Sequence, residues 1–316
     1  MRILFCGETF PAASGMLRQR LEAGGADEIV VSPSAAIQAA LDGVEMVVPL
    51  MSRIDAALMD AGRFRLIQQW GTGLDGVDLE AARSRGIWVA NVPASGGNAD
   101  SVAEHTILLI LASLRHVPTA RANLQRGVLG APLGTMLAGR TVTLYGLGAI
   151  AKALVRKLRA FDARLVGITR DPAAPKVREM GLDAVYSTAD RAKGLAQTDI
   201  LVVCLSLSEE TRGAIDGDAL AALPPGAFLI NPARGALVNY DALYAAVAGG
   251  RLGGVGLDVY WEEPIAPDDP LLRFPNVIAT PHIAGVTDRS YEEIADAVVE
   301  NVERLRRGEP PLNRNV

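Results

Sequence analysis

The most informative segment of the chain is TVTLYGLGAIAKALVRKLRA, which occupies residues 141–160. It opens with a short apolar run, turns at two glycines and continues with the apolar spacing of a helix. A strand, a glycine-rich turn and a helix in this order form the phosphate-binding unit of dinucleotide sites. Gly146 permits the tight turn, and Gly148 lets the backbone approach a pyrophosphate at the helix N-terminus. Ala151 replaces a third glycine and is still small enough for close packing of the helix on the strand.

Turns of this kind also occur in flavin proteins, in methyltransferases and as purely structural turns, so the surrounding sequence matters. Downstream, short apolar runs alternate with segments of helical spacing, which is typical of parallel strands joined by helices. This part of the chain therefore predicts a complete doubly wound sheet that binds a dinucleotide. Its six strands are expected at residues 141–145, 164–168, 200–205, 228–231, 254–258 and 277–279.

The first third of the chain has the same alternation, and it predicts a second α/β layer structure. Strands are expected at residues 3–6, 28–31, 46–49, 66–69 and 87–90, with helical spacing at 16–23 and 35–41. A buried helix is expected at 98–116 and an amphipathic helix at 288–307, whereas 119–139 is typical of a loop or projecting arm.

Length and composition describe an ordinary core-forming protein. The chain has 316 residues, about twice the usual size of one domain, so two domains are expected. Hydrophobic residues make up 49% of the chain and charged residues 21%. Cys6 and Cys204 lie inside apolar runs, and we expect both to be buried thiols and neither a nucleophile nor half of a disulfide. No metal site is expected.

Charge and hydropathy make several classes of partner poor candidates. The net charge is −5, and the only concentration of basic residues is the short group Arg304, Arg306 and Arg307, so nucleic acid is not an expected partner. No run of about 20 apolar residues is available to cross a membrane. The apolar run at 1–7 is too short for a signal peptide, so a cytoplasmic protein is expected.

Three ionisable residues stand just behind predicted strands of the downstream sheet. Arg234 lies in NPARG, Glu263 in GLDVYWEEP and His282 in TPHIAG. Because ligands of open α/β sheets bind outside the carboxyl ends of the strands, these side chains are expected to converge on one cleft. An arginine grips a carboxylate with paired hydrogen bonds. A histidine delivers a proton to a carbonyl, while a neighbouring carboxylate holds the ring in place.

Taken singly, each of these residues has an ordinary structural explanation. A lone arginine is more often a surface ion-pair partner, a lone glutamate is more often solvated, and a lone histidine can cap a helix. The combination with the glycine-rich turn, in a chain with only three histidines, favours a catalytic site. His105 and His116 lie on or near the predicted buried helix, and we expect both to be structural.

These segments resemble the D-isomer-specific 2-hydroxyacid dehydrogenase family over residues 68–285. The ordered set GLGAIA, NPARG, GLDVYWEEP and TPHIAG carries the resemblance, with WGTGLDGVD at 70–78, NVP at 91–93 and VAE at 102–104. The family includes phosphoglycerate dehydrogenases, glyoxylate/hydroxypyruvate reductases, and formate and phosphite dehydrogenases. The resemblance implies an oxidoreductase that transfers a hydride between NAD(P)(H) and a small 2-oxo or 2-hydroxy acid, such as glyoxylate or hydroxypyruvate.

The resemblance also assigns roles to individual residues. It places the substrate-carboxylate arginine at Arg234, the acid that orients the histidine at Glu263 and the acid/base at His282. Main-chain substrate contacts fall on Thr72 and Gly73. The expected cofactor-binding residues are Gly146, Gly148, Ala149, Ile150, Thr169, Arg170, Ser206, Thr211, Ala233, Asp258 (at the nicotinamide carboxamide), His282 and Ala284.

The resemblance implies two doubly wound parallel-sheet domains of the Rossmann type, of which the substrate domain is discontinuous. The substrate domain is expected at 1–97 plus 288–316 and the dinucleotide-binding domain at 98–287, with hinge helices at both crossings. Family members are usually dimers, so a homodimer is expected, with 119–139 as the arm that reaches across.

One departure from the family pattern lies after the third of the strands predicted downstream. The proline that is common at this position is missing from CLSLS at 204–208, although Ser208 and Thr211 still offer hydroxyl groups to a nucleotide.

The end of the strand at 164–168 indicates the cofactor preference. NAD-specific domains carry an Asp or Glu about 20 residues after the glycine-rich turn. Here Thr169 occupies that position and Arg170 follows, and a hydroxyl and a guanidinium suit a 2′-phosphate. Asp171, just before Pro172, is expected to point away or to support Arg170. We expect NADP(H) to be preferred; in the alternative, Arg170 is a solvated loop residue and NAD(H) serves as well.

Two other functions are open at this point. A formate- or phosphite-type dehydrogenase would use a similar scaffold with different substrate-side residues. Some relatives are NAD(P)-sensing transcriptional corepressors, and the triad of Arg234, Glu263 and His282 does not exclude such a scaffold. The expected partner is a small 2-oxo or 2-hydroxy acid, with neither nucleic acid nor membrane.

Overall fold

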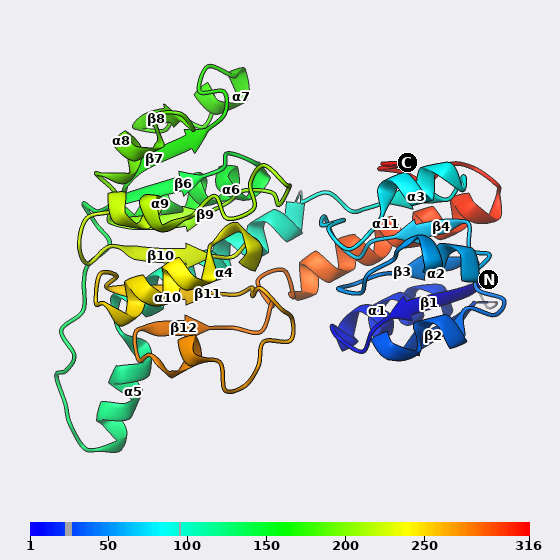
Figure 1. Ribbon diagram of the computed structural model, residues 1–316, viewed down its shortest axis with the longest axis horizontal. Helices are drawn as coiled ribbons and strands as arrows, with labels where there is room; N and C mark the ends of the chain where they lie inside the picture. The colour runs from blue at the N-terminus through cyan, green and yellow to red at the C-terminus, as the bar shows by residue number, and fades with distance from the viewer. Residues whose placement is uncertain (23–26, 95) are drawn as a thin grey trace. The chain divides into compact units, whose positions relative to one another are not determined.

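A computed structural model describes residues 1–22, 27–94 and 96–316, and the chain divides into two compact units (Figure 1). The first unit comprises Met1–Asn98 and Thr287–Val316, and the second comprises Ala99–Val286. The first unit is therefore discontinuous in sequence. The chain leaves it within the first turn of α4 (Gly96–Leu114) and returns at Thr287, whose hydroxyl oxygen accepts from the Ser290 amide to cap α11 (Asp288–Arg306).

The first unit contains a five-stranded parallel sheet of order β2-β1-β3-β4-β5 in its described residues. The strands are β1 (Arg2–Cys6), β2 (Glu28–Ser32), β3 (Met46–Val48), β4 (Leu66–Gln68) and β5 (Trp88–Ala90). The helices are α1 (Pro11–Glu22), the 3₁₀ helix η1 (Ser34–Ala40), α2 (Ala56–Ala61), α3 (Leu79–Ser84) and α11. All five strands were expected from their apolar runs.

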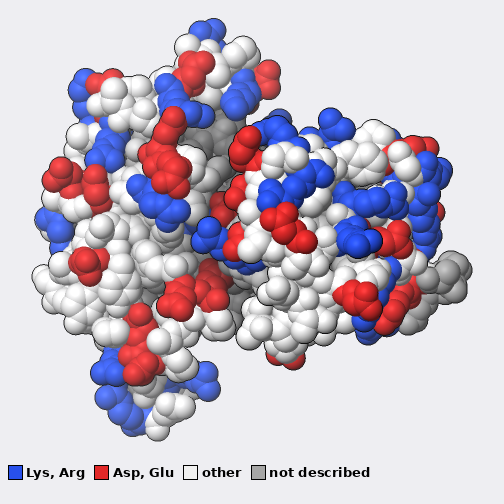
Figure 2. Space-filling model, turned by 45° about the vertical axis from the view of Figure 1, so that its right-hand side comes forward, with Lys and Arg blue, Asp and Glu red and all other residues white. Residues whose placement is uncertain are grey.

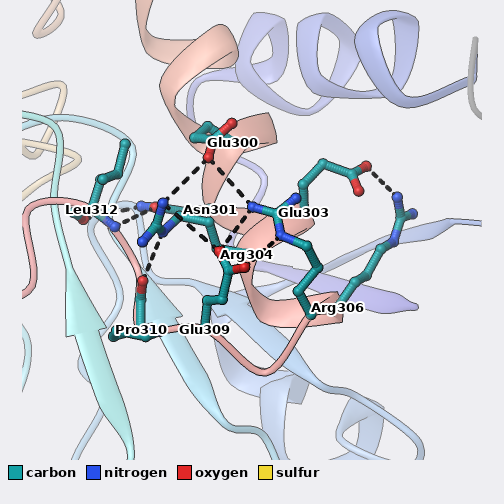
Figure 3. Close-up of polar contacts among 9 residues, drawn as sticks. Glu300, Asn301, Glu303, Arg304, Arg306, Glu309, Pro310 and Leu312 are labelled. Atoms are coloured by element: carbon teal, nitrogen blue, oxygen red, sulfur yellow. Dashed lines mark hydrogen bonds and ion pairs between the residues drawn. The ribbon is translucent and has the colours of Figure 1, made fainter.

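A buried side-chain amide, that of Asn301, ties the C-terminal segment of the first unit to this sheet, and Figure 3 shows its contacts with Leu312. The Asn301 side chain donates to Gln68 Oε1 at 2.6 Å and to the Leu312 carbonyl at 3.2 Å, and it accepts from the Leu312 amide at 2.6 Å. Arg304 donates to the Pro310 carbonyl at 2.8 Å. The end of the chain then pairs with β5, because the Asn315 amide donates to the Val89 carbonyl at 2.7 Å.

The second unit contains a seven-stranded parallel sheet of order β12-β11-β10-β9-β6-β7-β8. Its strands are β6 (Thr141–Tyr145), β7 (Arg164–Thr169), β8 (Ala184–Ser187), β9 (Ile200–Val203), β10 (Phe228–Asn231), β11 (Gly254–Leu257) and β12 (Val277–Ala279). The six-strand expectation missed β8. This strand lies at the edge of the sheet with every residue half-buried, so its sequence AVYS carries no continuous apolar run.

Helices cover both faces of the second sheet, which makes it doubly wound. One face packs against α4 and α6 (Ala149–Leu158), and the other packs against α8 (Arg191–Leu195), α9 (Gly217–Ala222) and α10 (Tyr240–Ala248). Alternate residues of one strand enter different cores: Leu144 joins the first and Tyr145 the second. The remaining helices are α5 (Val117–Gln125), η2 (Arg159–Phe161), α7 (Pro175–Arg178), η3 (Gly235–Leu237) and η4 (Pro270–Arg273).

A loop or projecting arm was expected at 119–139, but the first part of this segment belongs to the helix α5. Pro118 suits the first turn of this helix, and the helix ends before Gly127, which has φ of +74°. In Figure 1, α5 lies away from the sheet of its own unit. This helix and the segment after it carry large apolar residues whose exposed fractions range from 45% to 93%: Leu124, Val128, Leu129, Leu133 and Met136. Figure 2 shows uncharged and basic side chains together on this part of the surface.

No helix among the residues that the structure describes is long and apolar enough to span a bilayer.

Candidate active site

The three ionisable residues singled out from the sequence follow three neighbouring strands. Arg234 comes after β10, Glu263 after β11 and His282 after β12, and these strands are adjacent in the order β12-β11-β10. Because all strands of the sheet are parallel, the loops leave it at the same carboxyl edge. The glycine-rich turn after β6 leaves from that edge as well.

Glu263 and His282 are in direct contact. His282 Nδ1 lies 2.6 Å from Glu263 Oε2, and the two side chains are only 23% and 13% exposed. Glu263 Oε1 accepts from the Tyr260 amide at 3.0 Å, which fixes the second carboxylate oxygen. Because an ionised carboxylate only accepts hydrogen bonds, Nδ1 carries a proton and Nε2 is the ring nitrogen that can exchange a proton with a ligand.

The backbone of His282 has an unusual conformation. Its φ is +53°, in the left-handed region, and its amide donates to the Thr280 carbonyl at 3.0 Å. The carboxylate of Asp258 accepts from the next two amides, Ile283 at 2.9 Å and Ala284 at 2.8 Å. Asp258 is 0% exposed, so the residue expected at the nicotinamide carboxamide is also the buried anchor of the His282 turn.

Tyr260 connects the Glu263 loop to the His282 turn, a role that sequence reasoning missed. Its hydroxyl donates to the Thr280 carbonyl at 2.8 Å, while its amide binds Glu263. Burial raises the pKa of Tyr260, and the charges of Asp258 and Glu263 add to the shift, so the hydroxyl stays protonated. The only sequence signal is the aromatic side chain in the GLDVYWEEP motif.

Arg234 is placed by a buried asparagine and a glycine. The Asn231 side chain donates to the Arg234 carbonyl at 2.8 Å and accepts from the Ala233 amide at 3.0 Å, which fixes the loop. A Cβ at Gly235 would lie 2.0 Å from the carbonyl carbon of Tyr260, so only glycine lets this loop pack on the Tyr260 backbone. The half-buried Arg234 side chain thus leaves from a loop that contacts the Glu263 loop.

The glycine-rich turn has the geometry that a dinucleotide requires. Gly146 has φ of +100°, and a Cβ there would lie 2.6 Å from the Cys204 carbonyl oxygen, where the chain leaves the neighbouring strand β9. Gly148 caps α6, and no atom lies within 4 Å of a Cβ built on it. Gly148 therefore leaves space at the start of a ten-residue helix that begins with Ala149 and Ile150, whose amides have no intrahelical partner. The residues therefore fit a pyrophosphate group.

The adenosine side of this fit depends on the end of β7. Thr169 is its last residue, and the 84%-exposed Arg170 side chain lies 3.3 Å from Glu210 Oε2. Asp171 accepts from the Ala173 amide at 3.0 Å, so it caps its own turn. Nearby, the Thr211 hydroxyl donates to the Ser206 carbonyl at 2.7 Å, so its single proton is used inside the loop.

Thr72 and Gly73 lie in the first unit, in a loop whose carbonyl groups are held by amide side chains. Asn91 donates to the Thr72 carbonyl at 2.8 Å, and Gln69 donates to the Gly73 carbonyl at 2.7 Å. Their expected role concerns the main-chain amides.

The cysteines are free, and burial raises the pKa of both Cys6 and Cys204 to about 12. In the described parts of the chain, no cluster of three or more His, Cys, Asp or Glu side chains is arranged to hold a metal ion.

Comparisons with known proteins agree with this geometry. The family model "D-isomer specific 2-hydroxyacid dehydrogenase, NAD binding domain" matches residues 107–284. The chain is 37% identical over 288 residues to the (S)-sulfolactate dehydrogenase of Chromohalobacter salexigens, which covers 88% of this chain and 90% of that protein. It is 33% identical over 294 residues to the glyoxylate reductase of Korarchaeum cryptofilum, covering 91% and 87%.

A solved structure supports the fold along the whole chain. The NADPH-dependent glyoxylate/hydroxypyruvate reductase of Sinorhizobium meliloti, in complex with NADP and malonate, has a TM-score of 0.85 at 33% identity and covers 99% of this chain and 96% of its own. In contrast, the chain spans about half the length of the D-3-phosphoglycerate dehydrogenases that it matches. That of Archaeoglobus fulgidus is 32% identical over 271 residues, which are 85% of this chain and 50% of that protein.

Proposed function

The chain belongs to the D-isomer-specific 2-hydroxyacid dehydrogenase family, and on this premise we propose that it reduces small 2-oxo acids to 2-hydroxy acids, or catalyses the reverse reaction, with a nicotinamide cofactor. The contact of 2.6 Å between His282 and Glu263, at the sheet edge that also carries the glycine-rich turn, is the observation that carries the proposal. In this proposal the second unit binds the dinucleotide and the first unit contributes to substrate binding.

Each side chain has one task in the reaction. Arg234 binds the substrate carboxylate with paired hydrogen bonds. His282 Nε2 gives a proton to the carbonyl oxygen during reduction and removes it from the hydroxyl during oxidation. Glu263 holds Nδ1 and favours the imidazolium form that donates this proton. The nicotinamide group, when bound, supplies the hydride for the carbonyl carbon or accepts it.

The amides of Thr72 and Gly73 are proposed as further ligands of the substrate carboxylate. Their loop is held by Asn91 and Gln69, so the amides would be presented without reordering of the backbone. We propose glyoxylate and hydroxypyruvate as substrates, because reductases named for glyoxylate or for both acids are similar to this chain over most of its length.

We propose that NADP(H) is preferred over NAD(H). Thr169 and Arg170 support the preference, because the strand end lacks the acid that would repel a 2′-phosphate. Glu210 opposes it, because its carboxylate lies 3.3 Å from Arg170 and would have to turn away from the phosphate. Both side chains are more than three-quarters exposed, so the pair is weak and easily opened.

We also propose a homodimer built on α5 and the segment that follows it. The apolar side chains Leu129, Leu133 and Met136 are 82%, 93% and 73% exposed, which is unusual for a monomer surface. Sedimentation of the parent protein and of the Leu133→Glu variant tests this proposal. A parent dimer that dissociates in the variant supports an interface at this segment, whereas a monomeric parent contradicts the homodimer.

One set of assays tests the activity and the cofactor preference. Glyoxylate, hydroxypyruvate, pyruvate and larger 2-oxo acids are each combined with NADPH and with NADH, in the parent and in Arg170→Ala. The parent is expected to turn over a small 2-oxo acid and to have a higher kcat/KM with NADPH than with NADH. In Arg170→Ala, the ratio of these two kcat/KM values is expected to fall. A parent without turnover on the panel contradicts the activity. A parent that favours NADH contradicts the preference alone.

A further inference from the structure

His105 makes a contact that its sequence context does not suggest. It lies on α4 with a side chain that is 11% exposed, and its Nε2 atom is 2.9 Å from Thr280 Oγ1. The same Nε2 atom is 3.4 Å from Asp258 Oδ1. Thr280 and Asp258 both hold the His282 turn, so the histidine that was expected to be structural contacts residues that support the proposed proton donor.

The direction of these hydrogen bonds follows from the number of protons available. Thr280 Oγ1 lies 2.6 Å from Asp258 Oδ1 and 3.4 Å from the Leu257 carbonyl, so its single proton goes to the carboxylate. The hydroxyl oxygen then accepts from His105. Because both atoms that face His105 Nε2 are acceptors, this nitrogen carries a proton and donates to them.

The carboxylate of Asp258 depends on these donors. Its burial raises the pKa of the group, but hydrogen bonds from His105, from Thr280 and from the amides of Ile283 and Ala284 outweigh burial and leave the pKa below its usual value. Asp258 is therefore ionised and accepts the hydrogen bonds that hold the turn together. A buried carboxylate without enough donors is costly, so the loss of one donor is expected to shift the others.

The turn needs this support because of its backbone. A non-glycine residue in the left-handed region, as His282 is with φ of +53°, persists only where its surroundings fix it. Hydrogen bonds to Asp258 fix the chain before and after His282: the Thr280 hydroxyl donates on one side, and the amides of Ile283 and Ala284 donate on the other side in sequence.

We propose that His105 is a positioning residue for His282: by donating from Nε2 to Thr280 and Asp258, it holds the turn in the conformation that presents the imidazole for proton transfer. The role rests on the proposed function of His282 as acid/base. His105 acts only through the turn and needs no contact with substrate.

Two variants of similar size separate donation from packing. The side-chain amide of His105→Gln can donate from roughly the place of Nε2, whereas His105→Leu fills similar volume without a donor. Misplacement of a reacting group by about 1 Å costs roughly 100-fold in rate. His105→Leu is expected to lower kcat about 10- to 100-fold, with a smaller change in the KM of the 2-oxo acid because Arg234 is untouched. His105→Gln is expected to regain most of the loss.

A readout without turnover keeps this test independent of the proposed function. The chain has three histidines, so the ring resonances are assigned by single substitutions, with His116→Asn as the control. In His105→Leu, the His282 resonance is expected to shift and its titration midpoint to move, whereas the Gln variant keeps parent values. The titratable groups packed around the turn, Glu263, Asp258 and Tyr260, are unchanged in both variants.

The possible results of these measurements have different consequences for the positioning role of His105 and for the proposed function. Parent kcat and a parent His282 titration in His105→Leu would overturn the proposal, and so would equal losses in the Leu and Gln variants, which would show that His105 only fills space. If the Leu variant does not fold, Thr280→Val interrupts the same contacts and is expected to give the same loss. If the parent turns over no 2-oxo acid, the proposed function fails, and the His282 resonance still decides whether His105 positions the turn.

Discussion

Substitution of Gly146 by alanine tests whether the glycine-rich turn is required by the fold itself. The residue has φ of +100°, which a side chain tolerates at a cost of about 1–3 kcal/mol. The new Cβ would also lie 2.6, 2.7 and 2.8 Å from three backbone atoms of Cys204 and Leu205, which cannot rotate away. Overpacking of this kind adds about 1–3 kcal/mol. A loss near 3 kcal/mol is expected, or about 6–12 °C in the melting temperature of a unit of this size.

Gly148→Ala is the matched control, two residues away in the same turn. Its φ is −95°, and no atom lies within 4 Å of the added Cβ. Alanine is a poorer helix cap than glycine, but it also loses less backbone entropy on folding, so the net change is expected to stay within about 1 kcal/mol. The added methyl group occupies the space in front of α6, so cofactor affinity is expected to fall although the fold is intact.

The two variants are compared by thermal unfolding without ligand and by titration with NADPH, followed by fluorescence. The two variants are expected to differ: Gly146→Ala loses stability, and Gly148→Ala loses affinity for NADPH at the stability of the parent. Equal melting temperatures for Gly146→Ala and the parent would refute the steric argument. Parent affinity in Gly148→Ala would refute the placement of the pyrophosphate.

Four further predictions concern the site and the fold. His282→Ala is expected to lower the rate of hydride transfer by at least 100-fold while NADPH binds as in the parent, because only the proton donor is removed; stopped-flow rates and a binding titration check both halves. Glu263→Gln replaces the charged acceptor of His282 Nδ1 by a neutral amide, so the rate of hydride transfer is expected to fall while NADPH binds as in the parent, and an unchanged rate would contradict the pairing. Asn301→Ala leaves Gln68 Oε1 and the Leu312 amide without their buried partner and should cost about 1–3 kcal/mol in chemical denaturation, whereas Glu300→Ala on the same helix, which loses only surface ion pairs, should cost less than about 1 kcal/mol. The pKa of Asp258 is lowered from 3.8 in the fold, so its ionised form stabilises the protein above that pH and the contribution is lost as pH falls through the folded value. The difference in unfolding free energy between the parent and Asp258→Asn should therefore shrink below about pH 4.

Sequence reasoning works where one strong local preference controls the structure. The runs at 141–145 and 228–231 are strands with the expected bounds, because every residue of both is buried and the apolar pattern is uninterrupted. It fails at β8, where half-burial at the edge removes that pattern, and at α5, where nearby prolines and glycines mask a helix of nine residues. In both places the outcome depends on neighbours that the local sequence does not reveal.

The site shows the same limit at the level of single contacts. The loops after β10, β11 and β12 could be placed at one edge of the sheet from their order and spacing alone. The hydrogen bond from His105 to Thr280 spans 175 residues and depends on the register of α4 against the sheet, which no local pattern encodes. Motifs therefore identify the reacting groups, whereas the groups that hold them in place emerge only with the fold.

At this edge of the sheet, buried polar residues hold the loops in place, and other residues of the same loops carry the side chains that react. A residue that must meet a ligand cannot be fixed by burial of its own side chain, so a buried polar neighbour at the strand end fixes it instead. Asn231, which is 0% exposed, closes the loop of Arg234 through both amide atoms. Asp258, also 0% exposed, gathers the turn of His282 through both carboxylate oxygens. Each is the last residue of its strand or the next one, where the regularity of the sheet still determines its position. Buried hydrogen bonds from residues at the strand ends thus fix the positions of the exposed loops relative to the sheet.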